Sequence, residues 1–182
     1  MGWVADSPGL RRRVLHVYAH HTFLSAQIAA VEAERRALLQ TSQEASIEKV
    51  RQLMHLRGIG INGAWLLVME FFGWRAFKNR REVGGLAGFT PTPYQSGESA
   101  REQGITKAGN RHVRWMTTEL AWSWLRFQPD SALSVWFRTR FGGGGKRLRR
   151  IGIVAVARKL LIALWRFLET GVLPEGAGLK EG

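Results

Sequence analysis

The N-terminal part of the chain places an apolar or long side chain at alternating steps of four and three residues, and this spacing constrains the fold more than any other feature. The positions are Leu10, Val14, Val17, His21, Leu24, Ile28, Val31, Arg35 and Leu38. Such spacing puts them on one stripe of an α-helix, so we predict a helix from Leu10 to about Thr41. Two partners fit the stripe: the chain's own domain, or another helix in a coiled coil.

The rest of the chain is also predicted to be helical. Segments from about Asn110 to Phe127 and from Ile151 to about Thr170 carry apolar side chains at helical spacing. No alternating run is long enough for a sheet, although residues 90–105 leave room for a two-stranded ribbon. We therefore predict an all-α protein in three parts. They are a long helix or coiled-coil segment at 1–46, a compact helical domain at 47–173 and a flexible tail at 174–182.

Positive charge is concentrated in one part of the chain. The formal net charge is +13, and residues 75–166 contain eighteen Lys and Arg against five Asp and Glu. A basic block of this kind is typical of polyanion binders. Nucleic acid is favoured over a membrane surface because the cations are spread over loops and not over one amphipathic helix. The chain has no cysteine for a disulfide or thiolate metal site, and we expect no membrane span, since Arg158 and Lys159 interrupt the apolar run near residues 151–164.

The stretch from Phe89 to Trp115 is the best candidate for chemistry. Pro91 and Pro93 exclude a helix, and Gly97 lets the backbone bend sharply after Ser96. We therefore predict a surface loop from which the Ser96 hydroxyl projects.

Cations and a helix start follow this serine in the sequence. Asn110 can cap a helix whose free N–H groups suit a phosphate. The cations are Arg101, Lys107, Arg111 and Arg114. They could neutralise charge on a transferring phosphoryl group, whereas the serine needs a base or metal to take its proton. We interpret the stretch as a nucleic-acid phosphate site with Ser96 as nucleophile. Ser99 is the alternative, and a local turn hydrogen bond is the simpler role for either serine.

Two further segments are predicted to contact a nucleic-acid backbone. Gly58 and Gly60 interrupt two helices as in a helix–hairpin–helix motif, whose backbone N–H groups can face a phosphate without reading sequence. A simple helical corner is the alternative. After the four glycines at 142–145, Lys146 and Arg147 begin a basic cluster that suits a flexible backbone-binding arm.

Several motifs resemble one transposase family. The segment GLAGFTPTPYQSGESAREQGITKAGNRHVRWMTTELAWSWLR contains a serine–glycine pair, then G-I-T-K-A-G-N, then an arginine-bearing helix. LRGIG precedes it and RRIGIVAVARKLLIALWRFLETGVLPEGA follows. Over about residues 10–177 the chain resembles the C-terminal (Tnp) half of the insertion-sequence one-ten family, with its one-one-one-one subgroup. The resemblance implies a serine that joins covalently to DNA, here Ser96 because it precedes Gly97. It also implies a guide RNA and a coiled coil used in assembly.

Full-length members of that family carry an N-terminal RuvC-like half with four metal-binding acidic residues, which this sequence does not contain. The resemblance therefore implies a truncated or split transposase that holds no cofactor itself and depends on divalent metal, such as Mg²⁺, in that other half. The expected partners are DNA, a guide RNA and a second copy of the chain, bound through the N-terminal helix, at the nucleoid of the bacterial cytoplasm. Two other classes stay open. One is a non-catalytic DNA- or RNA-binding module. The other is a serine hydrolase using His55 or His112, although neither has an obvious acid partner in the sequence.

Overall fold

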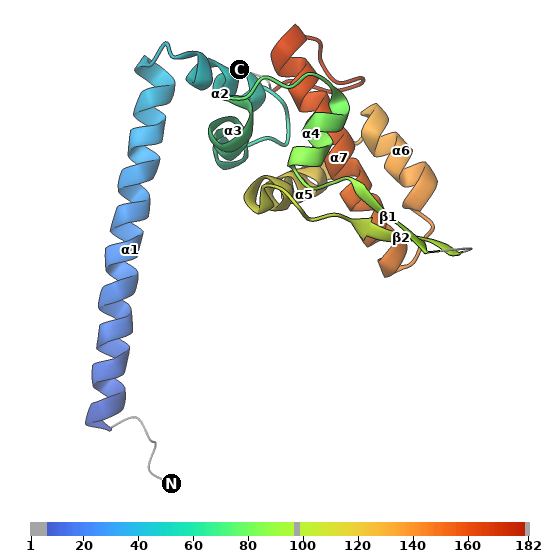
Figure 1. The fold of residues 1–182 in the computed structure, drawn as a ribbon. Helices are drawn as coiled ribbons and strands as arrows, with labels where there is room; N and C mark the ends of the chain where they lie inside the picture. Colours follow the sequence, from blue (N-terminus) through green and yellow to red (C-terminus); the bar gives the residue numbers. More distant parts are fainter. Residues whose placement is uncertain (1–6, 97–98, 181–182) are drawn as a thin grey trace. The chain divides into compact units, whose positions relative to one another are not determined.

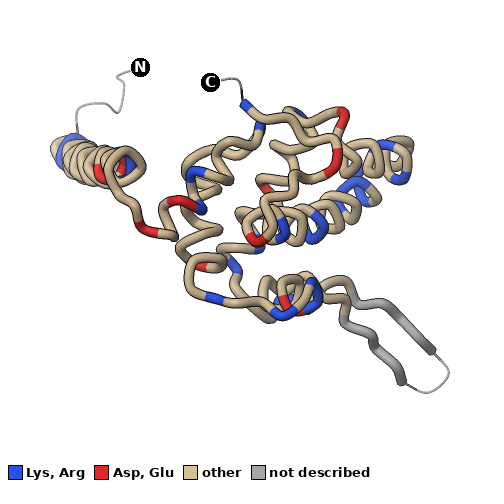
Figure 2. Tube along the Cα trace, turned by 90° about the horizontal axis from the view of Figure 1, so that it is seen from above, with Lys and Arg blue, Asp and Glu red and all other residues tan. Residues whose placement is uncertain are grey.

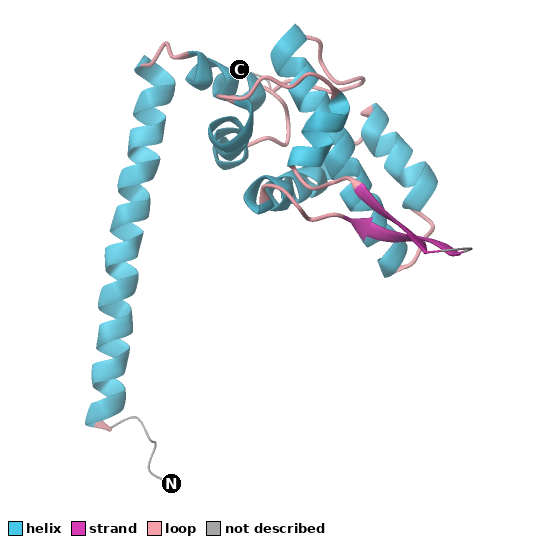
Figure 3. Cartoon of the chain, viewed as in Figure 1, coloured by secondary structure: helices cyan, strands magenta, loops and turns pink. Residues whose placement is uncertain are grey.

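The computed structural model describes residues 7–96 and 99–180, whose regular structure is helical apart from one two-stranded ribbon (Figures 1 and 3). The all-α prediction is confirmed. Contacts within the chain divide it into two units, one ending at Gln43 and the other beginning at Glu44. None of the described helices combines the length and the apolar character needed to cross a membrane.

The first unit is a single helix, α1 (Pro8–Thr41). Pro8 begins it. At this first helical position a backbone N–H would have no partner within the helix, so proline's lack of one costs no hydrogen bond. None of its described residues is buried. Six side chains of the predicted stripe are 43–61% exposed: Leu10, Val14, Val17, Leu24, Ile28 and Val31. The helix is confirmed, and a coiled-coil partner for it stays a prediction.

The second unit packs its helices around the last one. The elements are α2 (Ala45–Met54), α3 (Ile61–Leu67), the π-helical turn η2 (Val68–Phe72), α4 (Arg80–Leu86), α5 (Arg111–Phe127), α6 (Ala132–Phe141) and α7 (Lys146–Thr170). α7 contacts α2, α4, α5 and α6, and Figure 1 shows it running between α4 and α6. Leu160 and Leu164 of α7 are fully buried together with Trp124 of α5, so the core lies along α7.

Side-chain caps begin three of these helices. Asn79 caps α4, Asn110 caps α5 and Ser131 caps α6. Each side-chain oxygen accepts from first-turn N–H groups that no carbonyl within the helix can reach. Gly171 ends α7 in the left-handed conformation, with φ of 71°. The sequence had indicated both the Asn110 cap and the end of this helix near Thr170.

The serine-bearing segment is an antiparallel ribbon of β1 (Pro91–Ser96) and β2 (Ser99–Ile105). Pro91 pairs with Ile105 at one end and Ser96 pairs with Ser99 at the other. Prolines are tolerated in β1 because each strand of a two-stranded ribbon has an edge that needs no ladder donor. This is the ribbon for which the sequence left room, in place of an irregular loop.

The end of the chain is tied to the helical body. The sequence predicted a flexible tail from residue 174, yet the described residues up to 180 make specific hydrogen bonds. The Gly178 N–H donates to Gln128 Oε1 (2.8 Å), while the Gly178 carbonyl accepts from Gln128 Nε2 (2.8 Å) and from the Arg57 N–H (3.2 Å). Gln128 is only 3% exposed, so the tail supplies partners that its buried amide needs.

Candidate nucleic-acid interface

Ser96 lies at the closed end of the ribbon. It is the last residue of β1 and pairs with Ser99, the first residue of β2. The turn at 97–98 and the side chains of 92–103, which include both serines and Arg101, lie outside the described structure. Because a strand rises about 3.3 Å per residue, the Ser96 backbone is about 16 Å along the ribbon from Pro91. The backbones of the two candidate serines are paired across the ribbon, and the choice between them stays a prediction.

The open end of the ribbon is fixed to the segment that precedes it. Three backbone hydrogen bonds join the two, from Thr106 to Thr90 (2.8 Å), from Lys107 to Gly88 (3.3 Å) and from Asn110 to Leu86 (3.0 Å). Gly109 has φ of 137°, and a Cβ there would collide with the Leu86 carbonyl. The G-I-T-K-A-G-N run thus anchors the base of the ribbon.

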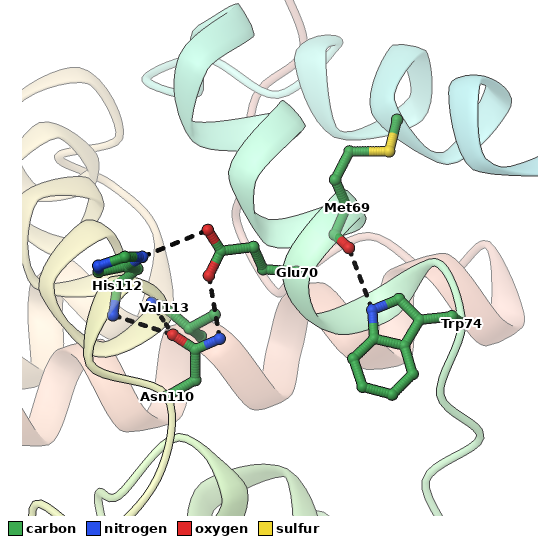
Figure 4. Close-up of polar contacts among 6 residues, drawn as sticks. All are labelled: Met69, Glu70, Trp74, Asn110, His112 and Val113. Carbon is green, nitrogen blue, oxygen red and sulfur yellow. Dashed lines mark hydrogen bonds and ion pairs between the residues drawn. The ribbon is translucent and has the colours of Figure 1, made fainter.

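Asn110 connects the start of α5 to the turn η2 (Figure 4). Its Oδ1 accepts from the N–H groups of His112 (2.9 Å) and Val113 (3.1 Å), and its Nδ2 donates to Glu70 Oε2 (3.0 Å). The other Glu70 oxygen lies 3.4 Å from His112 Nδ1. A carboxylate is favourable beside the positive end of a helix. Glu70 therefore stands beside the helix start that the sequence assigned to a phosphate, and a DNA contact by Asn110 stays a prediction.

Three of the four predicted phosphate-binding cations lie apart from Ser96, while the backbone of the fourth, Arg101, pairs with Tyr94 on the ribbon. Arg114 is half-buried, and its Nη1 donates to the Ala87 carbonyl (3.2 Å) at the base of the ribbon. Lys107 and Arg111 are exposed, and Lys107 has a left-handed φ of 55°. All three lie near the open end, while Ser96 lies about 16 Å along the strands. Within this chain the structure does not gather them around the serine.

Gly58 and Gly60 form a tight corner between α2 and α3. Gly58 has φ of 83°, and its carbonyl accepts from Ser123 Oγ of α5 (2.7 Å). Gly60 is exposed and precedes the first turn of α3. Between them Ile59 is buried, and its carbonyl accepts from Lys180 Nζ (2.8 Å). Burial lowers the pKa of Lys180 below its ordinary value. The corner is present, and its contact with DNA stays a prediction.

The predicted basic arm is the first turn of α7. Lys146 and Arg147 are exposed there, as are Arg149 and Arg150. The glycines before them make backbone hydrogen bonds, from Gly142 to Arg138 (2.9 Å) and from Gly144 to Phe141 (3.1 Å). Figure 2 shows Lys and Arg spread along this unit, with Asp and Glu in smaller number among them.

The described part of this chain contains no cluster of side chains that could bind the metal implied by the resemblance. No group of three or more His, Cys, Asp or Glu side chains there gathers closely enough to hold an ion. We therefore derive no chemical step through a metal on these residues.

The comparisons with known proteins cover this same region. A model of the transposase IS116/IS110/IS902 family matches residues 50–136, which include the corner at Gly58, the serine ribbon and all of α5. The chain belongs to this transposase family. The protein y4rJ of Sinorhizobium fredii, named as a transposase, is 44% identical over 165 residues, which are 86% of this chain and 41% of the relative. The transposase for insertion sequence element IS1328 of Yersinia enterocolitica is 27% identical over 114 residues, 63% of this chain and 33% of the relative. The chain thus spans less than half the length of these curated relatives.

One feature of this transposase domain was missed in the sequence. Glu70 is the sole charged residue in the run WLLVMEFF, and a carboxylate in an apolar run signals a polar partner. Its partner Asn110 is 40 residues away in the chain. Only the folding of η2 against the start of α5 brings the two together, and the same contact gives His112 the acid partner that its sequence neighbourhood lacks.

Proposed function

We propose that this chain is the DNA-binding and strand-transfer part of an insertion-sequence transposase, with Ser96 as the nucleophile. The Ser96 Oγ attacks the phosphorus of a DNA phosphodiester, forming an O–P bond while the bond to one sugar oxygen breaks. The leaving sugar hydroxyl takes up the proton that the serine gives up. One phosphodiester replaces another, so the exchange needs no further energy source.

The position of Ser96 in the ribbon carries this proposal. Ser96 is the last residue of a strand, β1, whose other end is anchored by three backbone hydrogen bonds. An anchored ribbon can present a residue at its far end to a large substrate such as DNA. A serine hydrolase using His112 is less well supported, because that histidine lies beyond the base of the ribbon, away from Ser96.

We assign the cations to the DNA backbone. Lys107 and Arg111 are exposed and contact phosphates beside the ribbon, whereas Arg114 and Asn110 hold its base in place. The corner at Gly58 and Gly60 and the first turn of α7, with Lys146 and Arg147, supply further contacts that do not read sequence. Pairing with a guide RNA sets the target. Such a protein works on bacterial chromosomal DNA, and we expect it at the nucleoid.

We further propose that α1 pairs with α1 of a second copy. Its stripe of exposed Leu, Val and Ile side chains has the four-and-three spacing of a coiled-coil seam. His21 and Arg35 interrupt the stripe, and polar residues at seam positions set the register of paired helices.

Trapping of the covalent intermediate tests the nucleophile. With DNA, Mg²⁺ and the acidic half of a family member supplied, we expect a protein–DNA species that survives denaturation. Ser96→Ala should abolish it and leave DNA affinity unchanged, while Ser99→Ala should retain it. The reverse pattern would move the nucleophile to Ser99. If the unaltered chain binds DNA but forms no covalent adduct, the result would favour the second candidate, a non-catalytic binding module.

The salt dependence of DNA binding tests the phosphate contacts. Lys107→Ala combined with Arg111→Ala should make the negative slope of log K against log salt shallower by about two units, at roughly 0.9 per phosphate contact. Arg126→Ala with Arg140→Ala removes the same charge from exposed positions on α5 and α6, and serves as the matched control. If both pairs change the slope equally, Lys107 and Arg111 make no specific contact.

A further inference from the structure

A groove follows α7 on a surface that the serine chemistry does not use. Its floor is the C-terminal half of α7, and residues at the starts of α4 and α6, which flank α7 in Figure 1, form its walls. None of the ribbon residues whose side chains the structure describes lines it. Its volume is about 1360 Å³, whereas most small-molecule sites hold roughly 300–1,000 Å³. A ligand that fills this groove is therefore larger than a typical small molecule.

The groove is predominantly cationic. Five basic side chains line it against two carboxylates, Glu169 and Glu175. The basic residues are Arg80, Arg81, Arg158, Lys159 and Arg166. They come from two different helices, so positive charge extends from one wall across the floor. This arrangement favours a ligand with repeated negative charges.

Apolar and aromatic surface lies between these charges. Ile162 and Ala163 contribute to the floor, and Trp136 of α6 lines the opposite wall. Lys159 Nζ lies 4.7 Å from the centroid of the Trp136 ring, so a positive charge and an aromatic ring are adjacent in the groove. A nucleotide offers the matching pair, a phosphate and a base. The faces of a base are available to a protein only where the strand is unpaired.

We propose that this groove binds a single-stranded nucleic acid, with its phosphates on the basic side chains and its unpaired bases against Trp136 and the apolar floor. The site is separate from Ser96, so the failure of either proposal leaves the other standing. An acidic protein segment could pair with the same basic side chains, but it would have no bases to stack on Trp136.

Binding of labelled oligouridine RNA, oligothymidine DNA and duplex DNA to the full chain tests this proposal. Lys159→Glu with Arg166→Glu should weaken binding of single strands by about tenfold or more and lower its salt slope by about 1.4, for two contacts at roughly 0.7 each. Arg126→Glu with Arg140→Glu makes the same change in net charge outside the groove. This control should lose less than about threefold, through the general field alone. Duplex binding should respond equally to both pairs.

Removal of the aromatic wall gives an independent readout. Trp136→Ala should weaken single-strand binding by about tenfold, as expected for one lost stacking contact, and Trp136→Phe should restore most of it. Trp136 also packs on Phe141, with ring centroids 5.4 Å apart, so thermal unfolding of each variant checks that the fold is kept. Loss for one type of strand would identify the groove as an RNA or a DNA site. Unchanged single-strand affinity in folded groove variants, or equal loss in the control pair, overturns the proposal.

Discussion

The two longest helices, α1 and α7, share a pattern of apolar side chains and differ in what covers it. α7 buries eight residues, whereas no described residue of α1 is buried. Leu160 of α7 is fully buried, while Leu24 of α1 is 46% exposed. The spacing of apolar residues identifies a helix and its apolar stripe. It does not identify the partner, because that partner comes from distant parts of the chain or from another molecule.

A leucine-to-alanine substitution should show the largest difference in stability effect between the two helices. Leu160→Ala removes fully buried atoms, and we expect it to lower the free energy of unfolding by about 2–5 kcal/mol. Leu24→Ala should change the stability of the second unit by less than about 0.5 kcal/mol and act instead on self-association. Urea unfolding followed by tryptophan fluorescence measures the first effect, since all tryptophans except Trp3 lie after residue 43. A similar cost for both substitutions would show that α1 packs on the second unit.

Adding one methyl group to a glycine should have opposite effects in the two units. Gly109→Ala forces a Cβ against the Leu86 carbonyl at φ of 137°, and should cost about 1–3 kcal/mol. A Cβ at Gly9 in α1 would lie at an ordinary contact distance of 3.7 Å from Ser7 Oγ, and Gly9→Ala should favour the helix by about 0.5–1 kcal/mol. Hydrogen exchange at the Lys107 and Asn110 amides reports the first change and circular dichroism the second. Unchanged protection in Gly109→Ala would contradict the close fit at the base of the ribbon.

The helix caps should show the smallest difference. Asn110→Ala removes an oxygen that caps α5 and should cost about 0.5–2 kcal/mol in thermal unfolding. Ser7 makes no side-chain cap bond at the start of α1, so Ser7→Ala should be nearly neutral. Asn110→Asp keeps the capping oxygen but sets a second carboxylate against Glu70, and should fall between the two. Equal stability of all three variants would show that the Asn110–Glu70 contact does not stabilise the base of the ribbon.

The local features of the second unit could be predicted because their causes are local. The cap at Asn110 and the end of α7 near Thr170 depend on residues within one helical turn. The room left for a ribbon came from prolines that exclude a helix. The Glu70–Asn110 contact and the anchoring of Gly178 by Gln128 could not be predicted, since each joins segments separated by 40 or 50 residues. The sequence placed the cations near Ser96, but the extended strands set Lys107, Arg111 and Arg114 at the other end of the ribbon.

By itself the sequence determined that the chain is helical, that its basic residues concentrate after residue 74, and that its motifs resemble those of a transposase. These properties follow from spacing, charge and residue type, which need no knowledge of distant neighbours. Only the tertiary structure decided which apolar stripe is covered, how the ribbon is anchored, and that α4, α6 and α7 form a basic groove. Burial and contact between distant segments arise when helices pack, and side chains far apart in the chain then share one surface.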